Sequence, residues 1–440
     1  MNATENLTRQ AGPPEAPTGT PTRVPTGVPT GVPTGVPTGV PTGVPTGVPT
    51  LTVAELEADP HGVYRAWRPR LPFVGHEVAG VLVLRARDVD LLMRDPRAQA
   101  TETLYPESRA IPEGALFDIF AHGMLTANGA VHRRRRSPFT RTFAARLIEG
   151  LRPRIRVAAE GLVRDWLGDG EVDLVARYTA QIPAQVIADI LGLPRDDIPR
   201  FTHLAYEVSR VLSFTFGPED IPDLEAAAVA LQDYVAGILA ARRSAPRADF
   251  LSRFLAETEV AGELTQQEVV IQLVQMIIGG TDTTRVAGSM QVALLLQHPE
   301  QWAAVSRDPD LIPAAVAESL RYEPSAGSAG RVAREDIPLD GHVVPAGSLM
   351  LLSTLSAMRD ETVYARPDTF DIRRTDLPRL HPVFGGGAHR CIGEALARVE
   401  LEEGLGAVLR LAPRLRLTGA MPVLRGHSGI RRIDALRVAA

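Results

Sequence analysis

The chain contains a single cysteine, Cys391, and the residues around it leave few choices for the local fold. Three glycines, residues 385–387, precede it, and glycine lets a backbone approach a neighbouring group closely or adopt positive φ. Gly393 follows it and opens a predicted helix, whose N-terminal amides favour negative charge on the sulfur. A lone cysteine is most often a small buried hydrophobic residue, but this setting indicates a thiolate that ligates a metal.

Composition excludes several other functions. The net charge of -5 argues against a nucleic-acid-binding protein, which usually carries a strong basic excess. All 47 basic residues are arginine, so Schiff-base chemistry on lysine and a Walker-type phosphate loop are excluded. No uninterrupted apolar run approaches the ~20 residues of a membrane span, and residues 1–10 lack the apolar stretch of a signal peptide. With one cysteine and no possible intramolecular disulfide, we expect a cytoplasmic protein that contacts no membrane.

The N-terminal part of the chain is repetitive. Residues 24–50 repeat Val-Pro-Thr-Gly, so that every fourth residue lacks a backbone donor and nothing between the prolines can pack. We therefore interpret residues 1–50 as a disordered, partly polyproline-II tail and residues 51–440 as one domain. An inert extension is favoured over a docking element, because the repeat forms no apolar anchor.

The rest of the chain is predicted to be mainly α-helical with a small β portion. Thr52–Glu55 and Thr265–Glu268 have the spacing of a capping box and mark two helix starts. The second of these helices is long and apolar and runs past Met290. Short strands are expected at residues 80–84 and within residues 332–350.

Residues 384–393 read Phe-Gly-Gly-Gly-Ala-His-Arg-Cys-Ile-Gly. They match every fixed position of Phe-Gly-x-Gly-x-His-x-Cys-x-Gly, and the chain in this respect resembles the cytochrome P450 family. The resemblance implies the P450 fold, mainly α with a small β domain, and haem b (iron protoporphyrin IX) as cofactor. It implies that Cys391 ligates the iron and that Phe384, His389 and Gly393 support the haem. Further motifs in the family's order extend the resemblance over about residues 55–440.

The segment Gly279-Gly280-Thr281-Asp282-Thr283-Thr284 is similar to the family's oxygen-binding segment. Two glycines inside a helix cost on the order of 1 kcal/mol each relative to alanine, and alone they would indicate only close packing. By resemblance, Gly280 belongs to a local distortion that leaves space for dioxygen next to the haem iron. Asp282 and Thr283 are then the catalytic pair, a proton source and a hydroxyl for cleavage of the O–O bond.

Four basic residues are assigned to the haem propionates by the same resemblance. His132 and Arg136 share one side of a predicted helix and match the family's His-x-x-x-Arg. Arg331 and His389 complete the set. The other nearby arginines are expected on the surface, either simply solvated or forming a basic patch for an acidic electron donor, and they are Arg133, Arg134, Arg135, Arg390 and Arg398.

Two further segments are informative. Glu318 and Arg321 match the family's Glu-x-x-Arg, a buried pair, although an isolated pair of this spacing is usually solvated. Its third member is either Arg373 or Arg374. Residues 325–330 are all small, where the family usually has larger apolar residues, which suggests extra room near the iron or a different backbone path.

The resemblance implies a haem-thiolate monooxygenase. Such an enzyme activates dioxygen and inserts one oxygen atom into a small-molecule substrate, for the family often a natural product. The chain has neither the four cysteines of a ferredoxin nor a dinucleotide fingerprint, so electrons are expected from a separate ferredoxin and ferredoxin reductase. Alternatives are the same fold with desaturation or ring coupling as the outcome, a peroxygenase, which Asp282 and Thr283 disfavour, and a non-catalytic haem-binding sensor.

Overall fold

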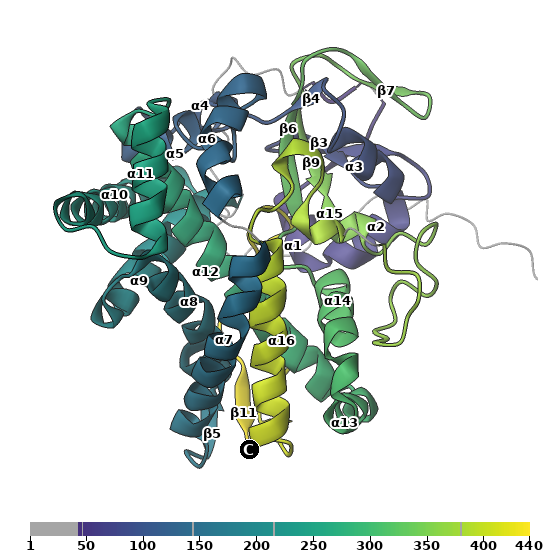
Figure 1. The fold of residues 1–440 in the computed structure, drawn as a ribbon. Coiled ribbons are helices and arrows are strands. Elements are labelled where there is room, and N and C mark those ends of the chain that lie inside the picture. The colour runs from purple at the N-terminus through teal and green to yellow at the C-terminus, as the bar shows by residue number, and fades with distance from the viewer. Residues whose placement is uncertain (1–42, 46, 143–144, 214–215, 379–380) are drawn as a thin grey trace, which may run out of the picture. The chain divides into compact units, whose positions relative to one another are not determined.

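The structure is a computed structural model that describes residues 43–45, 47–142, 145–213, 216–378 and 381–440 (Figure 1). Helices dominate these residues, as expected from the sequence. They are α1 (Val53–Ala58), α2 (Pro60–Trp67), α3 (Ala86–Leu92), α4 (Leu104–Ser108), α5 (Ala115–Ala121), α6 (Gly129–Thr142), α7 (Ala145–Trp166), α8 (Gln181–Leu191), α9 (Ile198–Ser209), α10 (Ile221–Ser244), α11 (Phe250–Ala261), α12 (Gln266–Gln297), α13 (Pro299–Arg307), α14 (Ile312–Tyr322), α15 (Thr354–Ala357) and α16 (Glu394–Leu411).

The β portion is small and centres on one mixed sheet of order β1-β2-β3-β9-β6-β4. The β1–β2 and β3–β9 pairs are parallel and the others antiparallel. Helices α3 and α15 lie beside this sheet (Figure 1). The strands are β1 (Thr50–Leu51), β2 (Phe73–His76), β3 (Gly80–Val83), β4 (Ala98–Gln99), β5 (Glu171–Asp173), β6 (Ser328–Ala333), β7 (Ile337–Leu339), β8 (His342–Val344), β9 (Leu349–Ser353), β10 (Arg416–Leu417) and β11 (Arg437–Ala439).

Both predicted capping boxes are present. At the start of α1, the Glu55 amide donates to the Thr52 hydroxyl at 3.2 Å, and the Thr52 amide donates to the Glu55 carboxylate at 2.8 Å. At the start of α12, the same reciprocal bonds join Thr265 and Glu268. These interactions satisfy amides that the first helical turn leaves without partners, which is why the spacing alone located both helix starts.

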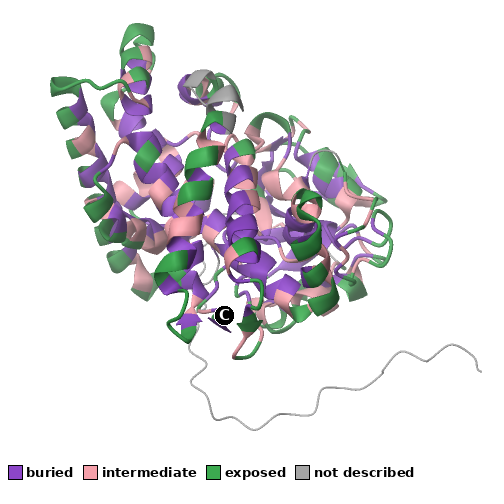
Figure 2. Cartoon of the chain, turned by 60° about the horizontal axis from the view of Figure 1, so that its bottom comes forward, coloured by how far each residue is buried: buried purple, intermediate pink, exposed green. Residues whose placement is uncertain are grey.

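Helix α12 forms the centre of the core. Its sequence is apolar on most of its circumference, so it is buried along most of its length by α8, α9, α10, α14 and α16. Helix α16 in turn runs beside α7 (Figure 1), and buried residues occupy the inner faces of these helices in Figure 2. Since α16 begins directly after the Cys391 loop, the packing of α16 on α12 fixes the position of that loop relative to the glycine-containing part of α12.

One described helical segment, Pro218–Ser244, is long and apolar enough to cross a membrane by length and composition. Its mean hydropathy reaches 1.4, and 39% of that window is buried in the protein. The segment contains α10, which packs against α5, α9 and α12. The sequence expectation concerned uninterrupted apolar runs, and acidic residues such as Asp223 and Glu225 interrupt this segment.

The predicted tail ends inside a strand. Residues 1–42 lie outside the described residues, whereas the last residues of the repeat contact the sheet. Val48 packs against the apolar cluster of β3 and β9, the Gly75 amide donates to the Pro49 carbonyl at 2.8 Å, and Thr50 pairs with Gly75 in β1. The packed chain thus begins before residue 51, because the final Val-Pro-Thr supplies an apolar and a β-branched side chain to an open strand edge.

Two deletions test this boundary. We expect removal of residues 1–42 to leave the melting temperature of the holoprotein unchanged, since a Pro- and Gly-rich repeat is not expected to contribute to a core. Removal of residues 1–50 should lower it by about 2 °C or more, because β2 loses its edge partner and the site that buries Val48 is opened. Scanning calorimetry of both variants measures the difference. Equal melting temperatures for the two would contradict the placement of β1.

Candidate functional site

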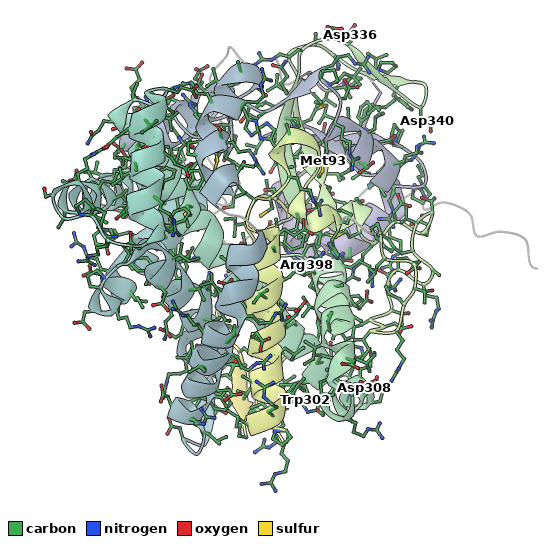
Figure 3. The ribbon with its side chains drawn as sticks, viewed as in Figure 1. Met93, Trp302, Asp308, Asp336, Asp340 and Arg398 are labelled. Carbon is green, nitrogen blue, oxygen red and sulfur yellow. The ribbon has the colours of Figure 1, made fainter. Side chains whose placement is uncertain are left out.

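Cys391 ends a tightly closed loop. Its amide donates to the Phe384 carbonyl at 2.8 Å, and Gly385 and Gly387 adopt positive φ values of 70° and 61°. A Cβ atom on Gly387 would lie 2.6 Å from the Met93 carbonyl oxygen, so only glycine allows the loop to pack on the end of α3. Figure 3 labels Met93 at this position. The predicted need for glycine around Cys391 therefore has a specific cause at residues 385 and 387.

The charge state of Cys391 depends on more than its loop. Its side chain has accessible surface, yet protein surrounds the sulfur closely enough that burial raises the pKa of the thiol. The Gly393 amide, as the sequence predicted, and the Arg136 and Arg390 charges act in the opposite direction without outweighing burial. A thiol of this kind becomes a thiolate when it ligates a cation. Cys391 is therefore suited to hold a metal and is not an activated free nucleophile.

The structure brings four predicted residues together beside this loop. His132 and Arg136 come from α6, Arg331 from β6, and His389 from the loop itself. The two imidazole rings lie with their centroids 4.2 Å apart. Burial, followed by the charges of the neighbouring arginines, lowers the pKa of His132 to about 4 and that of His389 to about 3. We refer to these four residues as the cationic cluster.

Nothing anionic balances the cationic cluster within the described residues, where none of the four forms an ion pair with a carboxylate. His132 Nε2 is buried without a hydrogen bond. Arg331 is buried and donates to the carbonyl of its neighbour Gly330, and burial lowers its pKa to about 10. Arg136 donates to the Arg390 carbonyl at 2.5 Å. Buried cations are costly unless an anion pairs with them. The cluster therefore fits a ligand that carries carboxylates, as haem does.

The arginines between His132 and Arg136 do not all lie on the surface. Arg135 is buried and donates to Glu268 at 2.9 Å, and Arg134 donates to the same carboxylate at 2.8 Å. Only Arg133 is exposed and free of such a contact. The prediction of three surface arginines was therefore wrong for Arg135, whereas Arg134 is partly exposed, and both hold α6 to the first turn of α12.

The predicted basic patch also carries less unpaired positive charge around Arg390 and Arg398. Arg390 and Arg398 both approach Glu394, with shortest N–O distances of 2.6 and 3.1 Å. Arg398 additionally lies over the Phe384 ring, 5.1 Å from its centroid, at the end of α16 labelled in Figure 3. Glu394 and Glu268 thus neutralise much of the charge that the sequence suggested for a docking surface.

In the middle of α12, the predicted catalytic pair is held by different contacts. Asp282 is buried, accepts from Arg285 at 2.5 Å through one oxygen and from the Ser209 hydroxyl at 2.6 Å through the other. Thr283 is partly exposed, and its hydroxyl donates to the Gly279 carbonyl at 2.9 Å. A Cβ atom on Gly279 would meet nothing within 4 Å. Gly279 and Thr283 therefore share one open face of the helix, while Asp282 faces α9.

Gly280 was predicted to leave space for dioxygen, but in the structure it faces α8. A Cβ atom there would lie 2.6 Å from the Ile187 side chain of α8, and the helix assignment continues through this position. Gly280 therefore serves the close packing of α8 on α12, the simpler of the two readings of a glycine inside a helix. The open face beside Thr283 belongs to Gly279.

One acid that sequence reasoning did not single out lies behind α12. Glu400 of α16 is fully buried, hydrogen-bonds Thr284, and has one carboxyl oxygen without a partner. Burial raises its pKa well above the ordinary value. A small cavity of about 20 Å³, room for one water, lies beside it. The sequence contained a signal for this buried acid, because Glu400 is four residues from both Leu396 and Gly404 and so lies on the apolar face of its helix.

The Glu318–Arg321 pair is buried, as the resemblance implied. Arg321 donates to both Glu318 oxygens, at 2.7 and 2.8 Å, and both side chains are fully inaccessible. The third member is Arg374, whose Nε lies 2.8 Å from Glu318, whereas Arg373 is exposed. The three residues join α14 to the segment that leads into the Cys391 loop.

This chain matches a family model and curated relatives over most of its length. The model of the family described as cytochrome P450 matches residues 105–411. A plant-inducible cytochrome P450-pinF1 of Rhizobium radiobacter is 43% identical over 88% of this chain and 91% of its own length. Nocardicin C N-oxygenase of Nocardia uniformis is 35% identical, over 80% of this chain and 86% of its own.

Solved structures of cytochrome P450 enzymes are also similar to this chain. P450BioI, in complex with an acyl carrier protein that carries hexadec-9Z-enoic acid, superimposes with a TM-score of 0.82 at 29% identity, covering 88% of this chain and all of the other. CxnD, described as a cytochrome P450 enzyme for C–S bond formation in chuangxinmycin biosynthesis, has a TM-score of 0.81 at 31% identity, covering 89% and 97%.

The cationic cluster gives a test that separates ligand binding from folding. Arg331→Met keeps the apolar stem but removes a buried charge, so we expect haem to be lost during gel filtration while the melting temperature of the apoprotein does not fall. Arg133→Met, the exposed arginine of the same region, is the matched control and should retain haem. Equal haem content in both variants would show that the cluster does not hold the carboxylates.

Proposed function

The chain belongs to the cytochrome P450 family and is a cytochrome P450 monooxygenase, and we propose that it hydroxylates a small organic substrate of natural-product type. The observation that carries this proposal is the placement of the Cys391 loop beside the cationic cluster, whose buried members His132 and Arg331 have no carboxylate partner among the described residues. The substrate class follows relatives whose names specify such compounds, among them nocardicin C and mycinamicin VIII.

A haem-thiolate cofactor follows from the family, and we assign haem b. Cys391 would ligate its iron, with the Gly393 amide directed at the sulfur, and His132, Arg136, Arg331 and His389 would bind its propionates. When bound, the haem supplies the activation of dioxygen, using electrons delivered from outside. The protein supplies the ligand, the counter-charges and the proton donors.

Proton supply falls to α12. Reducing one atom of dioxygen to water consumes two protons, and Thr283 is the hydroxyl on the open face of the helix. Because a hydroxyl both donates and accepts, Thr283 can pass a proton onward once it leaves the Gly279 carbonyl. Asp282 is the adjacent acid, currently held by Arg285 and Ser209, and must turn from them to reach Thr283. Glu400 is a second acid, whose pKa burial raises, and it is joined to the neighbouring Thr284.

We propose that electrons come from other proteins. The family uses redox partners, and for this chain we propose a ferredoxin and its reductase in the cytoplasm, because residues 1–440 include neither a ferredoxin cysteine set nor a dinucleotide fingerprint. The contacts of Arg134, Arg135 and Arg390 with carboxylates leave the surface near the Cys391 loop less basic than the sequence suggested. Shape and apolar contacts should therefore contribute to docking beside charge.

An alternative outcome on the same fold is oxidative coupling. The similarity to CxnD favours it, since that enzyme's description specifies C–S bond formation. The two outcomes differ in the product, because coupling adds no oxygen atom. Mass spectrometry of the product formed under ¹⁸O₂ distinguishes them once a substrate is found. A sensor without turnover and a peroxygenase are both disfavoured by the acid and hydroxyl at Asp282 and Thr283.

The role of Thr283 can be tested directly. Thr283→Ala should leave substrate binding and iron reduction intact, since neither uses its proton, while electrons leave increasingly as hydrogen peroxide. We expect the product formed per NADPH consumed to fall by about tenfold, less than the ~100-fold or more typical of a lost proton-transfer group, because water can supply part of the protons. The assay is NADPH oxidation with parallel measurement of peroxide and product.

Thr283→Ser is the matched control because it keeps the hydroxyl, and it should restore most of the coupling. If Thr283→Ala coupled electrons to product as well as the wild type, the assignment of proton transfer to Thr283 would be wrong.

A further inference from the structure

A buried chain of hydrogen bonds joins the N-terminal part of the domain to its C-terminal loop. Glu57 of α1 accepts from the Gly426 amide at 2.7 Å, the His427 amide at 3.0 Å and His427 Nδ1 at 2.5 Å. His427 Nε2 lies 2.8 Å from Nε2 of His76, in β2. Both imidazoles are almost completely inaccessible, with exposures of 0% and 1%. Neither the fold class nor the haem site requires this pair.

The positions of the protons in this chain follow from its partners. His76 Nδ1 lies 3.2 and 3.0 Å from the amides of Val78 and Ala79, so it is the acceptor and carries no proton. The His76 proton is then on Nε2 and is donated to His427, which leaves the His427 proton on Nδ1, facing Glu57. Burial, with the charges of His427 and Arg109, lowers the pKa of His76 to about 3, so this one arrangement persists at neutral pH.

The loop that carries His427 packs between two other segments of the chain. The Gly327 amide donates to the Gly429 carbonyl at 2.8 Å, and Ala326 forms a bridge with Ile430. A Cβ atom on Gly429 would lie 1.7 Å from the Leu212 carbonyl oxygen, which follows α9. Residues 426–430 therefore lie in direct backbone contact with residues 326–327 on one side and with the end of α9 on the other.

The contacted segment leads directly to the haem site. Ser328 begins β6, and Arg331 of the cationic cluster follows three residues later. Although β6 is an inner strand of the sheet, residues 328–330 retain accessible surface, because β4 covers only residues 332–333. The uncovered part of β6 thus adjoins Arg331 of the cationic cluster, and loop 426–430 contacts the residues just before its other end.

From this arrangement we propose that the chain Glu57–His427–His76 holds loop 426–430 and the adjoining start of β6 in place, and so sets which ligands fit beside the haem. His427 is a positioning residue for this segment, and its loss should weaken the binding of large ligands more than that of small ones. This rests on the proposed function, since it assumes that haem and substrate bind beside Arg331. Small residues at 325–330 make the segment dependent on such support, because they fill little space themselves.

The experiment uses two azoles that bind ferric haem iron, imidazole and 4-phenylimidazole, with the holoprotein and a Soret titration as readout. His427→Ala removes both hydrogen bonds of this side chain, so loop 426–430 and the start of β6 lose their support. Ordering them when a large ligand binds then costs part of the binding free energy. We expect the Kd of 4-phenylimidazole to rise about tenfold and that of imidazole to change less than about twofold. The ferrous-CO spectrum should stay that of the wild type.

Two further variants keep the test decisive if His427→Ala folds poorly. Glu57→Gln changes a side chain at the partly exposed end of the chain, and it should shift the ratio of the two Kd values in the same direction by about threefold. Val305→Ala, a truncation at a fully buried position in α13, controls for lost stability alone and should leave the ratio unchanged.

An unchanged ratio in both His427→Ala and Glu57→Gln would overturn the inference, as would a ratio that moves in favour of the larger azole. Failure of the proposed function has a separate signature, because a wild-type protein without a thiolate-type ferrous-CO spectrum would show it before any variant is made.

Discussion

Burial of basic residues beside the Cys391 loop is the constraint on which the site depends. His132, Arg136, Arg331 and His389 come from three parts of the chain. Burial, followed by the Arg136 and Arg331 charges, lowers the pKa of both histidines, and burial lowers the pKa of both arginines. Bringing them together in a poorly solvated place costs free energy that only an anionic ligand can offset. The same fold meets its other buried charges with protein partners, as Glu318 does with Arg321 and Arg374. The difference marks the cluster as a binding site and the Glu318 group as a brace.

Helix α12 links this binding site to chemistry by presenting different residues on different faces. Thr283 and Gly279 face open space, Asp282 faces α9, and Thr284 faces α16 and its buried Glu400. Because the faces of one helix are fixed relative to each other, we propose that acids held on two sides, Asp282 and Glu400, supply protons to the Thr283 hydroxyl on a third. Gly280 allows the close contact with α8 that holds this helix in position.

Features that depend on neighbouring residues could be predicted from the sequence. The capping boxes and the Cys391 loop are complete within ten residues, so their spacing was sufficient. What could not be predicted depends on distant partners. Arg134 and Arg135 read as solvated because Glu268 is more than 130 positions away. Arg373 and Arg374 are adjacent, and only the path of the chain decides which one reaches Glu318.

The central claim is that Cys391 is the thiolate ligand of a haem that the surrounding fold is built to hold. The ferrous-CO difference spectrum of the purified holoprotein tests it most directly, with Cys391→His measured beside the wild type. The wild type should show the red-shifted Soret band of thiolate-ligated haem, and Cys391→His should bind haem but lack that band. A haem-loaded wild type without the band, or a Cys391→His variant that keeps it, would contradict the account.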